Sequence, residues 1–184
     1  QLLEQAGLPG APLGDLRSAG WAAGRIAQLV RDFELTADAA AAAAAMARRI
    51  LAGEGAWAWD AAQIDRALNE APLVHQGQNL RLDRLVRRRA TAQSPARWWV
   101  LDYKSAPQPE RQPQLMAQLR LYRAAVQAQV GAEPVSAAFL AGDGRLVVVD
   151  GDVAAPPVPP PPSAPPAPVP ANRKAGPDTR QQTL

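Results

Sequence analysis

The 184-residue sequence contains no cysteine, a single histidine and no run of eighteen apolar residues. The absence of cysteine excludes disulfides, zinc–thiolate sites and thiol nucleophiles, and it is compatible with a cytoplasmic setting. Without a long apolar run, we expect no membrane-spanning helix. A phosphate-binding loop of the form G-x-x-x-x-G-K-[ST] is also missing, so this chain carries no signal for ATP binding. The length is sufficient for one domain with a core, plus an appendage.

The charge balance says little about partners. Twenty Lys and Arg residues against seventeen Asp and Glu residues give a net charge of +3. Such a small excess permits binding to nucleic acid but does not by itself indicate it. The first residue is Gln1 and the start has no signal-peptide pattern, so we expect a piece of a longer protein with no secretory leader.

The two ends of the chain differ from its middle. Residues 1–18 are punctuated by Gly and Pro, which predicts a loop around a short helical turn. Residues 19–51 are predicted to be helical, with Thr36 or Asp38 placed to cap a second helix through an alanine run. Ten of the 19 prolines fall within residues 156–170, which predicts an extended, disordered tail.

The middle of the chain combines strand-like and helix-like segments. A short helix is predicted over residues 60–69, with Ile64 and Leu68 facing inward. Strands are predicted at residues 72–75, 79–88, 98–104, 135–140 and 145–149, and a long helix at residues 114–130. This order implies an α/β fold, a mixed sheet with helices packed on it. We divide the chain into a helical part (1–68), a core (69–152) and a proline-rich tail (153–184).

The most informative stretch reads WWVLDYKS and covers residues 98–105. It begins apolar and aromatic, which is typical of a buried strand, and it continues into an acid and a lysine two positions apart. Because side chains alternate across a strand, Asp102 and Lys104 are predicted to share one face. Charged groups at the end of a buried strand are costly unless they are paired or bind a metal.

A second acid, Asp83, lies at the centre of another strand-like stretch, about nineteen residues earlier. If the two stretches form a hairpin, Asp83 can lie near Asp102 and Lys104. Two carboxylates and a lysine make a minimal site for a divalent metal ion. Simpler interpretations remain open from these residues alone. Asp83 could be salt-bridged to a neighbouring arginine, and Asp102 with Lys104 could be an exposed pair of little energetic value.

Three blocks of sequence follow one another in this region: LRLDRLV (80–86), WVLDYKS (99–105) and QLRLYRA (118–124). Together they closely resemble the nuclease domain of RecB/AddA-type helicase–nucleases, which belongs to the PD-(D/E)xK superfamily. The family pattern has an "iDR(l/i)" strand, an "(i/v)DYK(t/s)" strand and a helix with "QLxLY", in this order. The resemblance covers residues 69–149 and implies a restriction-endonuclease-like mixed sheet flanked by helices.

The resemblance implies a DNA exonuclease that depends on Mg²⁺ or Mn²⁺. Asp83 and Asp102 would bind the metal, and the backbone carbonyl of Tyr103 is a further candidate ligand. Lys104 would orient or help to activate the attacking water and counter the charge of the phosphate. Four side chains are expected to contact the DNA: Gln118, Tyr122, Arg84 and Arg88.

The resemblance also implies a cellular setting. The chain would be the C-terminal part of a helicase–nuclease that processes double-strand ends in recombinational DNA repair. ATP would be bound by a helicase part outside this chain, and other subunits of the complex would be partners.

One position departs from the family pattern. Many members carry an upstream G-x-x-x-H on a helix, and its histidine also contacts the metal. Residues 24–28 read GRIAQ here, so Gln28 stands where the histidine would be, and the sole histidine, His75, lies elsewhere. A neutral glutamine is a poorer ligand, and weaker metal binding or lost activity is therefore one possible consequence. Glu70 is a candidate for an additional carboxylate.

Two other functions stay open at this point. The first is a degenerate nuclease fold kept as a DNA-binding or structural module, and the second is a proline-tailed interaction domain with no nucleic-acid role. A tyrosine such as Tyr122 on an apolar helix stripe is typical of a core. The three arginines at residues 87–89 can be a solvated turn or can hold phosphates. DNA binding at low salt would separate the two alternatives, because phosphate contacts are strongest there.

Overall fold

The computed structural model describes residues 3, 27, 30–106 and 108–149. Several sequence-based expectations fall outside these residues: the loop over 1–18, most of the first helical segment with Gln28, and the proline-rich tail. Among the described residues, no helix is both long enough and apolar enough to cross a membrane.

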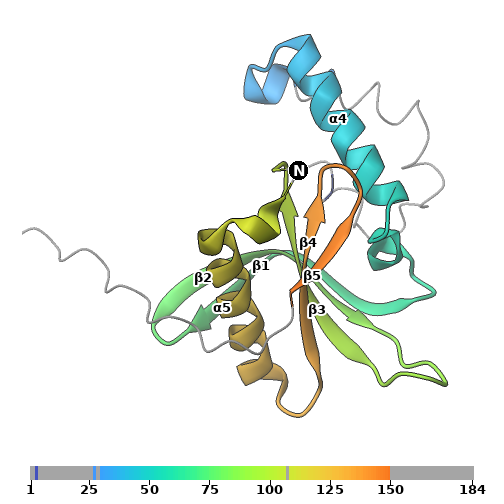
Figure 1. The fold of residues 1–184 in the computed structure, drawn as a ribbon, viewed down its shortest axis with the longest axis vertical. Helices are drawn as coiled ribbons and strands as arrows, with labels where there is room; N and C mark the ends of the chain where they lie inside the picture. Colours follow the sequence, from blue (N-terminus) through green and yellow to red (C-terminus); the bar gives the residue numbers. More distant parts are fainter. Residues whose placement is uncertain (1–2, 4–26, 28–29, 107, 150–184) are drawn as a thin grey trace, which may run out of the picture.

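Five strands form one mixed sheet in the order in which they occur along the chain (Figure 1). Their bounds are Ile64–His75 (β1), Gln78–Arg88 (β2), Arg97–Lys104 (β3), Val135–Ala141 (β4) and Leu146–Val149 (β5). Neighbouring strands are antiparallel except β3 and β4, which run parallel. The prediction of a mixed sheet flanked by helices is confirmed.

The helices and their ends follow from local sequence signals. The helices whose bounds are described are Ala37–Ala52 (α4), Pro113–Val130 (α5) and the short 3₁₀ turns Ala56–Trp59 (η1) and Pro109–Arg111 (η2). Residues 30–33 are helical as well. The Thr36 hydroxyl accepts a hydrogen bond from the backbone N–H of Ala39 and caps α4 as predicted. Gly131, with φ +64°, ends α5. Parallel strands need a crossover connection, and α5 supplies it between β3 and β4.

The sheet is covered on both faces by apolar side chains. One core lies between α4, η1 and one face of the sheet, and it includes Leu101 of β3. The other lies under α5 and includes Val100 and Leu119. Consecutive residues of β3 thus enter opposite cores, and the strand is buried on both sides as its apolar sequence predicts.

The short helix predicted over residues 60–69 is wrong, because β1 already begins at Ile64. The predicted boundary after residue 68 therefore falls inside a strand, and residues 64–68 belong to the sheet rather than to a helical part. Ile64 and Leu68 are four positions apart, a spacing that places two side chains on one side of a helix and also on one side of a strand. The long antiparallel pairing with β2 decides for the strand, in which Leu68 stays 52% exposed.

The turn between β4 and β5 connects the end of α4 with the end of β3. The Arg49 Nε–H donates to the carbonyl of Gly142 at 2.8 Å, and the Glu54 N–H donates to the carbonyl of Gly144 at 2.9 Å. The Gly142 N–H in turn donates to the carbonyl of Lys104 at 2.9 Å. A Cβ added at Gly53 would lie 2.1 Å from the Gly144 carbonyl oxygen, so only glycine fits at this approach.

Replacing Gly53 by alanine is expected to lower the free energy of unfolding by about 3 kcal/mol, because the new methyl group must displace backbone on both sides of the contact. The matched control is Gly77→Ala, where φ is +76° but nothing lies within 4 Å of the added Cβ. Its cost should be only the left-handed strain of about 1 kcal/mol. Urea unfolding of both variants tests this, and an equal or smaller loss for Gly53→Ala would contradict the close approach.

Candidate functional site

Asp102 and Lys104 lie at the C-terminal end of β3, which is flanked by β2 on one side and β4 on the other. Asp102 is buried, with only 4% of its surface exposed, whereas the Lys104 side chain is 21% exposed. The Lys104 Nζ atom lies 2.6 Å from Asp102 Oδ2. The contact is an ion pair. The prediction that the two side chains share one face is therefore confirmed.

Asp83 joins this pair because β2 separates from β3 at this residue. The pairing of the two strands runs from Arg88 opposite Arg97 to Arg84 opposite Leu101, and it stops there. Across Asp83 the alternation of side chains shifts, since Leu82 and Leu85 pack in the same core although they are three positions apart. Asp83 Oδ2 accepts a hydrogen bond of 2.9 Å from the Tyr103 N–H. Both predicted carboxylates and the lysine thus meet at one end of the sheet.

The electrostatics of the site centre on Asp102. Burial, and to a lesser extent the nearby negative charge of Asp83, raises the pKa of its carboxyl, while Lys104 acts in the opposite direction, and the resulting pKa is about 6. The ionised form that a metal would bind is thus disfavoured in the metal-free protein. A cation at this position would compensate the negative charge of the two neighbouring carboxylates.

The donor set fits a divalent cation that keeps part of its hydration shell. Mg²⁺ is commonly held by one or two carboxylates together with water and substrate phosphate oxygens, and Asp83 and Asp102 supply two. Among the described residues, no cluster of three or more His, Cys, Asp or Glu side chains converges on one point. Glu70, the suggested further carboxylate, is ion-paired with Arg81. The carbonyl of Tyr103 as a ligand stays a prediction.

The two residues of the "QLxLY" block lie on α5 and contact each other. The Gln118 side-chain amide donates to the Tyr122 hydroxyl at 2.8 Å. Tyr122 is 9% exposed and packs in the core beneath α5. Among the described residues, no hydrogen bond or ion pair joins this couple to Asp83, Asp102 or Lys104. Their contact with DNA stays a prediction.

The expected contact of Arg84 with DNA is not compatible with its position. Only 1% of Arg84 is exposed, and its guanidinium donates to the Ala58 carbonyl at 2.8 Å and to the Asn69 side chain. The guanidinium also lies 4.7 Å from the ring centre of Trp59, and burial lowers the pKa of this arginine. Arg84 therefore ties η1 to the sheet. The strand pattern is consistent with this burial, because Val86, two residues further along β2, faces the same core.

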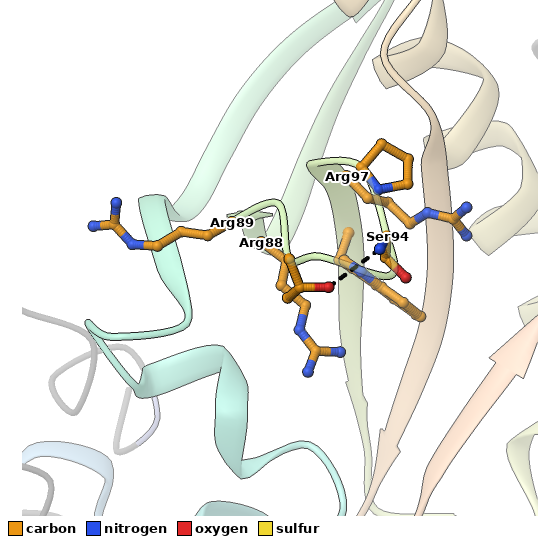
Figure 2. Close-up of a pocket in the computed structure, with 7 residues that line it drawn as sticks. Arg88, Arg89, Ser94 and Arg97 are labelled. Carbon is orange, nitrogen blue, oxygen red and sulfur yellow. Dashed lines mark hydrogen bonds between the residues drawn. The ribbon is translucent and has the colours of Figure 1, made fainter.

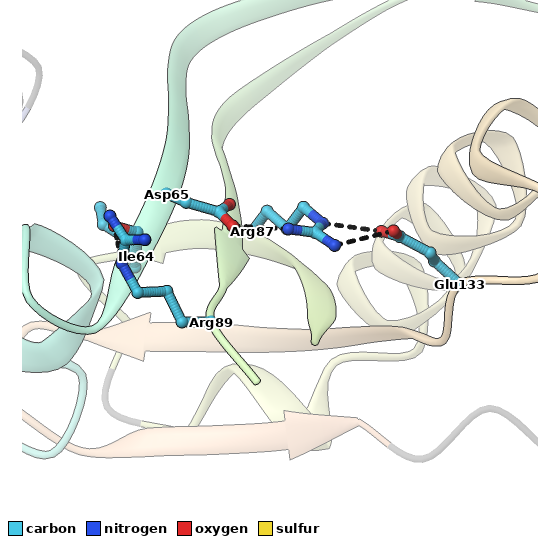
Figure 3. Close-up of polar contacts among 5 residues, drawn as sticks. All are labelled: Ile64, Asp65, Arg87, Arg89 and Glu133. Atoms are coloured by element: carbon cyan, nitrogen blue, oxygen red, sulfur yellow. Dashed lines mark hydrogen bonds and ion pairs between the residues drawn. The ribbon is translucent and has the colours of Figure 1, made fainter. Parts of the chain in front are cut away.

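Arg87 is also structural, although the sequence offered no means of separating it from its neighbours. Its guanidinium makes two hydrogen bonds to Glu133, at 2.8 and 2.9 Å, and a third to Asp65 at 2.5 Å (Figure 3). This bidentate contact raises the pKa of Arg87 and lowers that of Glu133. The three residues connect β1, β2 and the segment that precedes β4.

Arg88 and His75 lie away from the carboxylates. Arg88 closes the β2–β3 pairing at the end opposite Asp102, where its guanidinium lies 4.7 Å from the ring centre of Trp57. Its contact with DNA stays a prediction. His75 is the last residue of β1, opposite Gln78 in the turn to β2.

The comparisons with known proteins agree with this geometry. The family model of the PD-(D/E)XK nuclease superfamily matches residues 2–167, which is most of the chain. No curated protein matches the sequence.

The raised pKa of Asp102 predicts an unusual pH dependence of stability. The pKa of Asp102 is about 6 in the folded chain, against an ordinary value of 3.8 that applies to the unfolded chain. Ionisation of Asp102 therefore lowers the free energy of unfolding as the pH rises from about 4 to about 6. Asp102→Asn should therefore raise the free energy of unfolding of the metal-free protein at about pH 8, by up to about 3 kcal/mol, and the gain should vanish below about pH 4.

Asp143→Asn is the matched control. The hydrogen bond from Arg145 holds the pKa of the Asp143 carboxyl below its usual range, so this variant should lose stability at neutral pH rather than gain it. Denaturant unfolding in EDTA at several pH values measures both effects. A destabilised Asp102→Asn at pH 8 would show that Lys104 outweighs burial.

Proposed function

Because this chain belongs to the PD-(D/E)XK nuclease superfamily, whose members are generally metal-dependent nucleases, we propose that it hydrolyses phosphodiester bonds of DNA at the end of β3. The observation that carries the proposal is the meeting of Asp83, Asp102 and Lys104 there, with Asp102 buried and its pKa raised. Members of the superfamily typically use Mg²⁺ or Mn²⁺.

Each of the three side chains has a distinct role in this proposal. Asp83 and Asp102 would hold the cation, which would supply Lewis-acid chemistry at the phosphate. Asp83 is itself oriented by the Tyr103 N–H, so the backbone of β3 fixes one carboxylate while the strand carries the other. The partly exposed Lys104 ammonium faces both the carboxylates and solvent, where it can orient the attacking water and counter the charge of the phosphate.

The finer assignment rests on the three sequence blocks. Their order and spacing support a RecB/AddA-like exonuclease domain that acts on DNA ends in double-strand-break repair as part of a helicase–nuclease. ATP binding and the partner subunits would then belong to parts of that machine outside this chain. Val100 of the second block and Leu119 and Tyr122 of the third pack in the same core, which supports this assignment.

A second candidate is a degenerate nuclease fold that binds DNA without cleaving it. Two observations favour it: Gln28 occupies the position of the family histidine, and only two carboxylates meet among the described residues. The two candidates share the fold and the substrate, so only catalysis and cation binding can separate them.

Degradation of end-labelled linear DNA is the direct test. Wild-type protein should cleave with Mg²⁺ or Mn²⁺ and not with EDTA, and Asp83→Ala, Asp102→Ala and Lys104→Ala should each lose activity by about a hundredfold or more. Asp143→Ala and Arg145→Ala remove a matched acid–base pair in an exposed turn and should leave activity unchanged. Cleavage in EDTA, or full activity in the site variants, would refute the proposal. DNA binding by a folded protein without cleavage would establish the degenerate module.

Cation binding can be measured without any activity. A cation that binds only the folded protein stabilises it by about 2.7 kcal/mol at a hundred times its dissociation constant. Mn²⁺ should therefore raise the melting temperature of the wild type but not of Asp83→Ala, and Asp143→Ala should respond like the wild type. An identical rise in all three proteins would place the cation elsewhere.

A further inference from the structure

A basic hollow of about 290 Å³ lies at the other end of the β2–β3 pair, away from the carboxylates. It is formed where β2 ends, where the connecting turn folds back and where β3 begins (Figure 2). Its lining residues are Arg88, Arg89, Thr91, Ser94, Pro95, Arg97 and Trp99. Three of the seven are arginines, and none of the described residues that line the hollow is acidic.

The three arginines, here called the arginine fan, carry uncompensated charge. Within the described part of the chain, none of them forms an ion pair with a carboxylate. Their hydrogen bonds go to neutral oxygens: Arg88 donates to the Gln63 side chain, Arg89 to the Ile64 carbonyl and Arg97 to the Ser136 hydroxyl. Arg87, the adjacent residue, is held between Asp65 and Glu133 by contrast (Figure 3). Arg87 is thus paired with two carboxylates, whereas the adjacent Arg88 has no carboxylate partner among the described residues.

The scaffold of the arginine fan is ordered by packing and by hydrogen bonds. Arg88 lies over Trp57, which makes an edge-to-face contact of 5.3 Å with Trp99. In the turn, the Ser94 N–H donates to the Thr91 hydroxyl at 3.1 Å, and the Thr91 N–H donates to the Ser94 carbonyl at 2.8 Å. Groups fixed in this way lose little conformational freedom when a ligand binds.

The directions of the guanidinium groups indicate the shape of the ligand. Figure 2 shows Arg88, Arg89 and Arg97 pointing away from one another around the turn rather than toward one centre. Such an arrangement cannot chelate a single phosphate, but it matches an anion with charges repeated along its length. Guanidinium groups bind phosphate oxygens particularly well, and the backbone of DNA is a polyanion of this kind.

We propose that the arginine fan is a second DNA-binding site, which holds backbone phosphates of the same strand whose scissile bond lies at Asp83 and Asp102. This inference rests on the proposed nuclease function and extends it. Arg97 and Asp102 are five positions apart on β3, which corresponds to about 17 Å at about 3.3 Å per residue. Because both faces of β3 are covered by packed side chains, a DNA strand must pass around β3, and its path between the two sites is at least this long. A strand with the base stacking of B-DNA advances about 3.4 Å per nucleotide, so the two sites are at least about five nucleotides apart on such a strand.

The spacing makes binding dependent on DNA length. An oligonucleotide of about 4 residues can occupy one of the two sites, whereas one of about 16 residues can occupy both. Neutralising three phosphate contacts on single-stranded DNA changes the slope of log affinity against log salt by about 2, at about 0.7 per contact. A basic surface that binds DNA non-specifically would show no increase in affinity between the two lengths. Its salt slope would also not depend on which arginines are removed.

The test is DNA binding by the triple variant Arg88→Gln, Arg89→Gln, Arg97→Gln, measured in EDTA by fluorescence anisotropy with labelled oligothymidylates. Glutamine keeps part of the aliphatic stem and a polar end but removes the guanidinium, which at Arg88 lies over Trp57. The control is the triple variant Arg31→Gln, Arg66→Gln, Arg81→Gln, which removes three positive charges from other exposed positions. Both variants therefore lower the net charge equally, and circular dichroism melting verifies their folding.

The expected result is a salt slope less steep by about 2 for the arginine-fan variant and unchanged for the control, with a smaller gain in affinity from the 4-mer to the 16-mer. If the arginine-fan variant and the control lose affinity equally, the effect belongs to the overall field and the second site is refuted. If the wild type binds DNA and neither variant is impaired, only the second site falls. If the wild type binds no oligonucleotide even at low salt, the proposed nuclease function falls with it.

Discussion

The parallel pairing of β3 with β4 is the constraint on which the rest of the structure depends. Parallel neighbours cannot be joined by a tight turn, so the chain leaves the sheet after Lys104, forms α5 and returns over one face. With α4 and η1 on the other face, β3 is buried on both sides. Its C-terminal end is then the place where buried backbone meets solvent, and the polar residues of the strand are concentrated there.

That position has an electrostatic consequence. Asp102 is held in a nearly water-free environment next to a second carboxylate, and its raised pKa records the free energy stored in the arrangement. A fold selected only for stability would not place a carboxylate there, since an amide of the same shape would be less costly. The free-energy cost of burying this carboxylate would be offset if a cation and a phosphate complete the site. The same strand end that is least favourable in the metal-free protein is therefore the one best suited to bind metal.

The arginines of β2 show how neighbouring positions acquire unlike roles. Arg84 points into the core and stacks on Trp59, and Arg87 is fixed by Glu133 across the sheet. Arg88 alternates to the other face from Arg87 and reaches an aromatic ring, with no carboxylate partner among the described residues. Strand parity decides the face, and the segments that happen to pack on that face decide whether the charge is neutralised. Only the unneutralised arginines are available to a polyanion.

Much of this protein followed from the sequence alone, because its signals are local. Apolar alternation predicted β2 to β5, turn and cap residues predicted the ends of α4 and α5, and the two-residue spacing of Asp102 and Lys104 placed both on one face. Tertiary structure decided what depends on partners distant in sequence. Residues 64–68 became a strand because β2 was available to pair, and Arg84 was buried because η1 packs over it. The burial of a charged side chain such as Arg84 depends on segments distant in sequence, so local spacing could not predict it.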